Sequence, residues 1–193
     1  MKSLFLVLVL LAWFAAPANA DFDAGLAAYE RGDYATAFRE LKPLAEKGNA
    51  SAQSKLGFLY DTGKGVPQDY QAAMRWYRLA ADQGYAKAQF NLGLMHYDGT
   101  KVPQDYSEAL RWFRLSADQG YAMAQFNLGL MYYDGAGVPQ DYKAAMRWFR
   151  LAADQGDTAA QHNLGNMYSN GMGVPQDYQE AMRWWRLAAE GGK

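Results

Sequence analysis

The sequence predicts an all-α protein organised as an α/α solenoid, a stack of antiparallel helix hairpins. Trp76, Trp112, Trp148 and Trp184 follow one another at intervals of 36 residues, and a Leu-Gly pair and a Val-Pro-Gln-Asp-Tyr run recur at the same interval. A fixed period of this length is typical of stacked repeat units. Within each period the apolar residues recur at helical spacing, which favours helices over strands.

Residues 1–20 have the features of a secretory signal peptide. Lys2 gives the positive start, an apolar run follows from 4 to 16, and Ala18-Asn19-Ala20 is a small-residue cleavage sequence before Asp21. The apolar run is too short to cross a bilayer, which takes about 20 apolar residues. An uncleaved N-terminal anchor is the alternative. We therefore expect cleavage between Ala20 and Asp21 and a bacterial protein that is periplasmic or secreted.

The composition excludes several classes of protein. The chain has 19 Lys and Arg against 20 Asp and Glu, whereas a nucleic-acid-binding domain is usually strongly basic. Half of its residues are hydrophobic and 15% are aromatic, which excludes a disordered chain. There is no Cys, so neither a disulfide framework nor an acyl anchor on an N-terminal Cys is expected.

Residues 21–48 form a degenerate first unit. Tyr34 and Gly48 are in register with the later units, but the first half of this unit lacks the long loop and is expected to turn at Gly32. Glu40 stands where the later units have Trp. Because the outer face of a terminal repeat meets water, this unit is expected to be an N-terminal cap.

Four full units follow, at 49–84, 85–120, 121–156 and 157–193, and each is expected to be a helix hairpin. In the third unit, Ala124, Leu128 and Met131 lie on one face of the first helix. Gly135 is expected to end that helix in a left-handed conformation, and Asp141 to cap the second helix. The second helices are apolar on two sides, so they must be buried against their partners. In two units, a Glu three residues after the capping Asp completes a pattern typical of a capping box, at Glu108 and Glu180.

The repeated pattern Ala-x-x-x-Leu-Gly-x-x-Tyr-x-x-Gly-x-Gly-Val-Pro-x-Asp-Tyr, followed by Trp, resembles the Sel1-like repeat, a relative of the tetratricopeptide repeat. The resemblance covers essentially residues 49–191. It implies a right-handed superhelix and an adaptor role in assembling complexes. In bacteria it implies roles in envelope assembly, exopolysaccharide secretion, motility or host interaction. In the second unit, Lys101 replaces a loop Gly, which predicts a different turn, and His96 replaces a Tyr.

The positions on the first helix that differ between units are the candidates for ligand binding. They lie at i, i+4 and i+7, hence on one stripe, which by similarity to tetratricopeptide repeats faces the concave groove. With two flanking acids, the predicted groove comprises Phe58, Phe90, Leu94, Tyr97, Asp98, Phe126, Leu130, Tyr133, Asp134, His162 and Asn166. Such a trough suits a peptide with apolar anchors and a basic group. The alternative is that these aromatics pack between neighbouring helices. The invariant Gln53, Gln89, Gln125 and Gln161 are expected to be structural.

Two further surfaces are candidates. The second helices carry an arginine ladder, which could bind an anionic polymer, at Arg75, Arg78, Arg111, Arg114, Arg147, Arg150, Arg183 and Arg186. Asp82, Asp118, Asp154 and Glu190 follow one turn after the second Arg of each pair, so ion pairing on a solvated face is favoured. The last helix, with Trp184 and Trp185, has no polar cap after it. Self-association or docking of a partner at this end is predicted, and the alternative is that the tryptophans are simply partly exposed.

Catalysis is not predicted. The chain has no Cys and no Ser-x-x-Lys or Gly-x-Ser-x-Gly sequence, and His96 and His162 are too far apart for a local zinc pair. No metal or other cofactor is expected. The leading hypothesis is a non-catalytic, exported scaffold that binds a protein segment in its groove. Binding of an anionic polysaccharide is the alternative, and a β-lactam hydrolase is a distant third, because the cysteines of the family members associated with β-lactams are missing.

Overall fold

The computed structural model describes residues 18–191, which consist of α-helices joined by turns and irregular segments. Its helices are α1 (Ala18–Glu30), α2 (Tyr34–Glu46), α3 (Ala50–Thr62), α4 (Tyr70–Asp82), α5 (Ala86–Asp98), α6 (Tyr106–Asp118), α7 (Ala122–Asp134), α8 (Tyr142–Ala153), α9 (Thr158–Asn170) and α10 (Tyr178–Gly191). Most of the expected signal peptide lies outside the described residues. Ala20 and Asp21 fall inside α1, and their side chains are not among those described.

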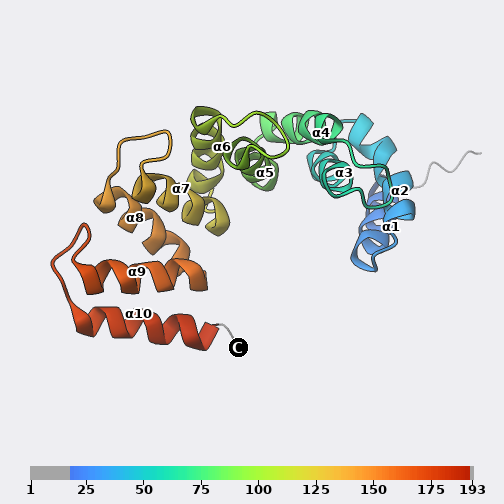
Figure 1. The fold of residues 1–193 in the computed structure, drawn as a ribbon. Coiled ribbons are helices and arrows are strands. Elements are labelled where there is room, and N and C mark those ends of the chain that lie inside the picture. Colours follow the sequence, from blue (N-terminus) through green and yellow to red (C-terminus); the bar gives the residue numbers. More distant parts are fainter. Residues whose placement is uncertain (1–17, 192–193) are drawn as a thin grey trace, which may run out of the picture.

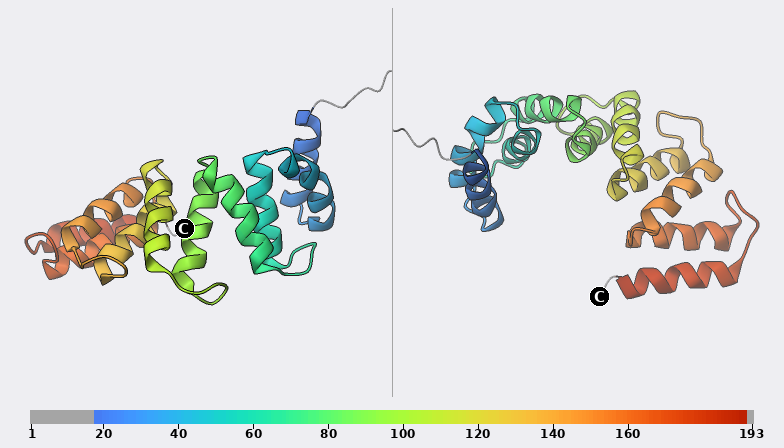
Figure 2. Two further views of the ribbon diagram at one scale, coloured as in Figure 1. Left: turned by 90° about the horizontal axis from the view of Figure 1, so that it is seen from above. Right: turned by 180° about the vertical axis from the view of Figure 1, so that it is seen from behind.

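The helices form hairpins that follow one another along an open arc (Figure 1). In the middle of the arc α3, α5 and α7 lie on its inner side, and α4, α6 and α8 lie on its outer side. Each helix packs mainly on the helix before it and the helix after it. Figure 2 shows from behind that the first and last hairpins lie at the two ends of the arc. The predicted α/α solenoid is confirmed. No helix of the described chain has the length and apolarity to span a membrane.

The hairpins are bounded by the capping residues that the sequence indicated. Asp141 has an extended backbone, and its side chain accepts a hydrogen bond from the N–H of Ala144 (2.9 Å) at the start of α8. Gly135 ends α7 with φ of +75°, and its N–H donates to the carbonyl of Met131. Both expectations are confirmed. A side chain at that φ is disfavoured, which explains why this helix ends at a Gly.

The invariant glutamines join consecutive units, as their structural role requires. The side-chain amide of Gln125 donates to the carbonyl of Ala117 (3.2 Å) near the end of α6, and its oxygen accepts from the amide of Gln155 (2.7 Å). Gln53 and Gln89 make the same two bonds in their units. In the last unit Gly191 stands where the partner Gln would be, and the buried Oε1 of Gln161 has no hydrogen bond. These bonds satisfy helix-end carbonyls inside the stack, where water cannot reach them.

The turn of the second unit differs from the others, as the replacement of Gly by Lys101 predicts. The equivalent glycines have φ of about +75°, whereas no residue other than Gly has a positive φ in the described chain. The ammonium of Lys101 instead forms an ion pair with Asp61 (2.8 Å) from the preceding unit. The substitution therefore exchanges a backbone conformation for an ion pair between units.

Candidate functional site

The predicted groove stripe divides into a packed part and an open part. Phe90 is 7% exposed and packs against Phe113 of α6, with ring centroids 5.9 Å apart. Phe126 packs in the same way against Phe149, at 5.7 Å. These contacts follow the alternative stated above, in which stripe aromatics fill the interior of the hairpin. Phe90 and Phe126 therefore form the floor of the inner surface.

Tyr97 and Tyr133 are half-buried, and each packs against the first residue of the second helix in its own hairpin. Tyr97 lies 5.4 Å from the ring of Tyr106, and Tyr133 lies 5.3 Å from the ring of Tyr142. Burial raises the pKa of Tyr97, and the charge of Asp134 raises it further. The hydroxyl of Tyr133 contacts the sulfur of Met172 in the next unit (3.3 Å). Both rings are therefore anchored, with one edge left at the surface.

The remaining predicted stripe residues differ in exposure. Asp98, Asp134, His162 and Leu94 are exposed, whereas Phe58, Leu130 and Asn166 are half-buried. The side chain of Asn166 accepts a hydrogen bond from the indole N–H of Trp185 (3.2 Å). Trp184 is only 3% exposed, so the alternative, partial exposure of the tryptophans at the C-terminal end, is wrong for this residue. Self-association through this end stays a prediction.

A cavity on the inner side of the arc brings together residues of four units. We call it the groove pocket. Its volume is about 130 Å³, and its walls come from α1, α3, α5 and the start of α7. Its aromatic side chains are Tyr29, Phe58, Tyr85, Phe90 and Tyr121. Phe58 and Phe90 are the two members that the stripe predicted, so the stripe located the inner wall of the pocket but not its whole lining.

The polar lining of the groove pocket was missed by the sequence reasoning. It consists of Ser54, which lies on the stripe but was left out of the predicted groove, and of Lys55, Lys87 and Asn91, with the exposed Met123 at the edge. Lys87 and Asn91 are four residues apart on α5, on a stripe next to the predicted one. The sequence carried a signal for them, since the four units have Ser51, Lys87, Met123 and Ala159 at one of these positions. The predicted groove is only partly acidic, through Asp98 and Asp134, and the pocket in its N-terminal half is lined by cations.

The electrostatics of the groove pocket come from partial burial and from like charges. Burial lowers the pKa of Lys55, and the neighbouring charge of Lys87 lowers it further, while Glu30 opposes the shift. The Lys55 ammonium lies 4.6 Å from the ring centroid of Tyr29. Burial, followed by the charge of Tyr34, raises the pKa of Tyr29 to about 12. At neutral pH the tyrosine is therefore a neutral hydrogen-bond donor.

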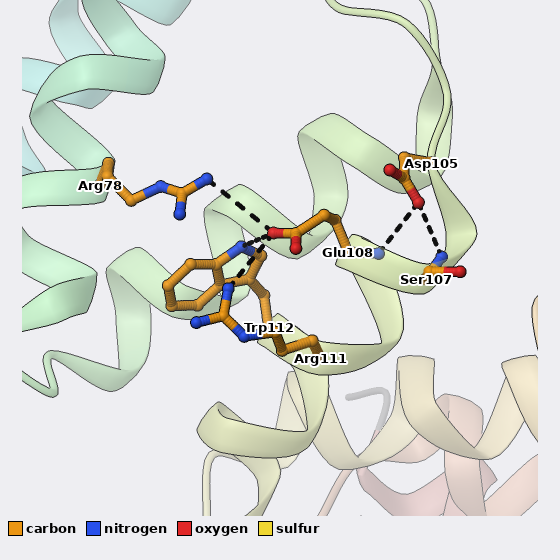
Figure 3. Close-up of polar contacts among 6 residues, drawn as sticks. All are labelled: Arg78, Asp105, Ser107, Glu108, Arg111 and Trp112. Carbon is orange, nitrogen blue, oxygen red and sulfur yellow. Dashed lines mark hydrogen bonds and ion pairs between the residues drawn. The ribbon is translucent and has the colours of Figure 1, made fainter.

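The outer surface uses much of the arginine ladder for packing (Figure 3). Glu108 accepts a hydrogen bond from the indole N–H of Trp112 (2.9 Å) and pairs with the guanidinium groups of Arg111 (3.4 Å) and Arg78 (3.9 Å). The two guanidinium groups lie 4.5 and 4.9 Å from the Trp112 ring. The Glu108 side chain therefore binds the indole instead of completing a capping box, although Asp105 still accepts from the N–H of Glu108.

The expected ion pairs of the ladder are wrong. In the described chain no Arg pairs with Asp82, Asp118, Asp154 or Glu190, and the arginines of the ladder that form ion pairs do so with Glu108 or Glu180. The reason is that the second Arg of each pair extends toward the next unit, as seen for Arg78, Arg114 and Arg150. Arg150, for example, donates to the hydroxyl of Tyr168 (3.0 Å) and lies over Trp184 at 4.6 Å. Where His96 replaces the corresponding Tyr, Arg78 turns to Glu108.

The outer surface has a hollow on α4 and a larger one at α8 and the loop before α10. We call the larger one the outer hollow. Its volume is about 560 Å³, and its cationic lining is Lys143, Arg147 and Arg150, over an apolar floor that includes Met146 and Leu151. No carboxylate lines it. The third unit has Ala144 where the second has Glu108, which explains why these cations keep their charge uncompensated.

The described residues contain no cluster of His, Asp and Glu that could hold a metal ion. The groove pocket offers ammonium, hydroxyl and amide donors and aromatic faces, which are the groups of a binding site.

The fold and the site define a class: a helical repeat protein whose units share a framework and differ along an inner groove. The Sel1 repeat model matches residues 50–85, 86–121, 122–157 and 158–193. The chain belongs to the Sel1 repeat family, whose members are typically non-enzymatic scaffolds for protein interaction.

Solved structures support this assignment. A protective antigen from uropathogenic Escherichia coli strains is 44% identical, with a TM-score of 0.79 over 81% of this chain and 33% of that chain. The present chain thus spans about a third of that protein. A Sel1 repeat protein from Oxalobacter formigenes is 37% identical, with a TM-score of 0.84 over 89% of this chain and 68% of that chain. An immunity protein from Pseudomonas aeruginosa shares the fold alone, at 24% identity and a TM-score of 0.58 over 91% of this chain and 65% of that chain. No curated protein sequence matched.

Proposed function

We propose that the protein is an exported, non-catalytic scaffold of the bacterial envelope or secreted fraction that binds a segment of another protein in its concave groove. The observation that carries the proposal is the groove pocket, where aromatic, amide and ammonium groups from four units face one cavity. Aromatic walls supply most of the affinity in peptide grooves, and a few polar groups fix the register of the ligand. A pocket shared between units exists only in the assembled stack, so binding would depend on the fold.

Variants at exposed positions test groove binding without damaging the interior. Leu94 and Met123, 36% and 46% exposed, lie on the inner helices, and Leu79 and Leu151, 49% and 47% exposed, lie on the outer helices. Leu94→Glu/Met123→Glu should lower the affinity for a groove peptide by about tenfold or more, because each Glu must be desolvated against an apolar ligand. Leu79→Glu/Leu151→Glu introduces the same charges and should bind normally. The readout is the binding of peptides selected from a random displayed library, with helicity followed by circular dichroism.

The outer hollow supports a second candidate function, the binding of an anionic envelope polysaccharide. The three cations that line it, with no carboxylate among them, favour this candidate. It requires retention on an immobilised acidic polysaccharide that falls with salt and is lost in Lys143→Glu/Arg147→Glu. If that variant and the wild-type chain are both unretained at low salt, the candidate fails.

The leucine variants also locate the protein-binding surface. If Leu79→Glu/Leu151→Glu loses peptide binding and Leu94→Glu/Met123→Glu keeps it, the protein-binding surface lies on the outer side of the arc.

The proposal that the protein is exported is based on its N-terminal sequence and can be tested separately. Protein recovered from the periplasm or the medium should begin at Asp21, because the small-residue sequence before it is the expected cleavage site. N-terminal sequencing of that material gives the answer. A chain found only in the cytoplasm, with residues 1–20 retained, would contradict the proposed location and leave the groove unaffected.

A further inference from the structure

Two positive charges share the groove pocket, and Glu30, whose charge acts on Lys55, lies outside the pocket lining. Lys55 of α3 and Lys87 of α5 both line it, and in the described part of the chain neither takes part in an ion pair. Lys55 is half-buried, and its pKa is lowered by burial and by Lys87, as described above. Lys87 is exposed. A half-buried charge beside a like charge is unfavourable for folding, and such groups occur preferentially at sites that bind or react.

The rest of the lining adds donors and no acid. Asn91 presents a side-chain amide, and the hydroxyl of Tyr85 lies 3.3 Å from the hydroxyl of Ser51 at the pocket wall. Tyr121 is kept neutral, because burial and the neighbouring Tyr85 raise its pKa. No carboxylate lines the pocket. Every charged residue in the lining is therefore a cation, and the other polar residues there can donate hydrogen bonds.

The size of the pocket limits what it can hold. Its volume of about 130 Å³ corresponds to roughly four water molecules at their share of liquid volume. That space suits one short side chain or a chain end and excludes a folded element. The aromatic rings of Tyr29 and Phe58 then cover the apolar part of whatever carries the charged group.

We infer that the groove pocket is an anchor for a carboxylate group on the bound protein segment, held between Lys55 and Lys87. The inference rests on the proposed function, since it requires a protein segment in the groove. The carboxylate receives charge-assisted hydrogen bonds from both ammonium groups, and an apolar neighbour in the segment packs on the aromatic wall. The carboxylate is that of an Asp or Glu side chain or that of the segment's C-terminus, which present the same chemistry.

A selection from a random displayed peptide library tests the inference and the proposed function separately. Wild-type residues 21–193 should enrich peptides with an acidic residue next to an aromatic or aliphatic one. Selection on Lys55→Met/Lys87→Met should lose the acidic preference and keep the apolar one. Peptides enriched without any acidic preference, and whose binding is unchanged when their C-terminus is amidated, would overturn the carboxylate anchor and leave the groove function standing. Failure to enrich any peptide would overturn both.

Synthetic peptides then locate the carboxylate. Replacing the enriched acid by its amide should weaken binding by about tenfold or more, the effect of losing hydrogen bonds to charged groups. Amidating the C-terminus of the same peptide separates the two sources, since only a terminal anchor responds to it. Lys47→Met, which removes one charge from an exposed position at the end of α2, is the matched control for Lys55→Met and should leave binding unchanged. A peptide that binds wild type and Lys55→Met/Lys87→Met equally well would overturn the inference.

A stability measurement distinguishes a ligand-binding role of Lys55 from a purely structural one. Removing a half-buried charge next to a like charge should leave the thermal midpoint of Lys55→Met unchanged or raised. A fall in peptide affinity without a fall in stability is the signature of a ligand-binding group. A fall in both, with affinity restored at low temperature where the variant is folded, would assign Lys55 to the framework and overturn the inference.

Discussion

Trp112→Ala is expected to lower the free energy of unfolding by about 3 to 5 kcal/mol, the range for truncating a fully buried aromatic side chain. Trp112 is 1% exposed, and two guanidinium groups lie against its ring. Its loss would leave a cavity between the second and first full units and would also remove the indole donor of Glu108. Because each unit of a solenoid is stabilised by its neighbours, damage at this internal contact weakens both sides of the array. Urea unfolding of residues 21–193, followed by circular dichroism, measures the effect.

Trp148→Ala is the matched control for this prediction. Trp148 occupies the same position one unit later but is only half-buried, and no cation lies over its ring in the described chain. It should therefore lose distinctly less stability than Trp112→Ala. A third variant, Glu108→Gln, keeps the packing and removes the charge, and should cost about 1 kcal/mol or less because the carboxylate is partly solvated. Equal losses for the two tryptophans would show that the arginine-flanked ring has no special role.

The contrast between these tryptophans shows where sequence reasoning stops. The period of 36 residues, the capping Asp141 and the terminal Gly135 predicted the hairpins, because each of these signals is local. The direction in which an Arg side chain extends is not local. Arg78 could meet Asp82 on its own helix or Glu108 on the next unit, and the stacked Trp112 ring decides for Glu108.

The candidate site was predicted only in part for a similar reason. Variation between units identified Phe58 and Phe90, which line the groove pocket. It did not separate exposed stripe residues from packed ones, because Phe90 and Leu94 have the same helical spacing and differ only in what the second helix places against them. Lys55 and Lys87 were missed, because they lie on the adjacent stripe and were not considered with it. These two lysines line one pocket only because two units lie side by side in the folded chain.

Gly129→Val is expected to be nearly as damaging as the loss of Trp112, at about 3 kcal/mol, the upper part of the usual range for overpacking a core. A Cβ at Gly129 would lie 2.6 Å from the nearest ring carbon of Phe149, closer than real contacts allow. The ring is fully buried and is itself held by Phe126 and Tyr133, so it has no room to move. The inner and outer helices of the third hairpin must therefore separate. Urea unfolding with Asn127→Val as control, a half-exposed position on the same helix, measures the cost.

A double-variant cycle identifies the Phe149 ring as the cause. If the ring causes the loss, Gly129→Val should cost much less in a Phe149→Ala background, because the truncated side chain leaves space for the new methyl groups. The coupling energy between the two positions should then be favourable and exceed about 1 kcal/mol, within the range for residues in contact. Additive effects would mean that the Phe149 ring is not the cause of the loss. Favourable coupling would mean that Gly129 and Phe149 together set the distance between the helices on which the floor of the groove rests.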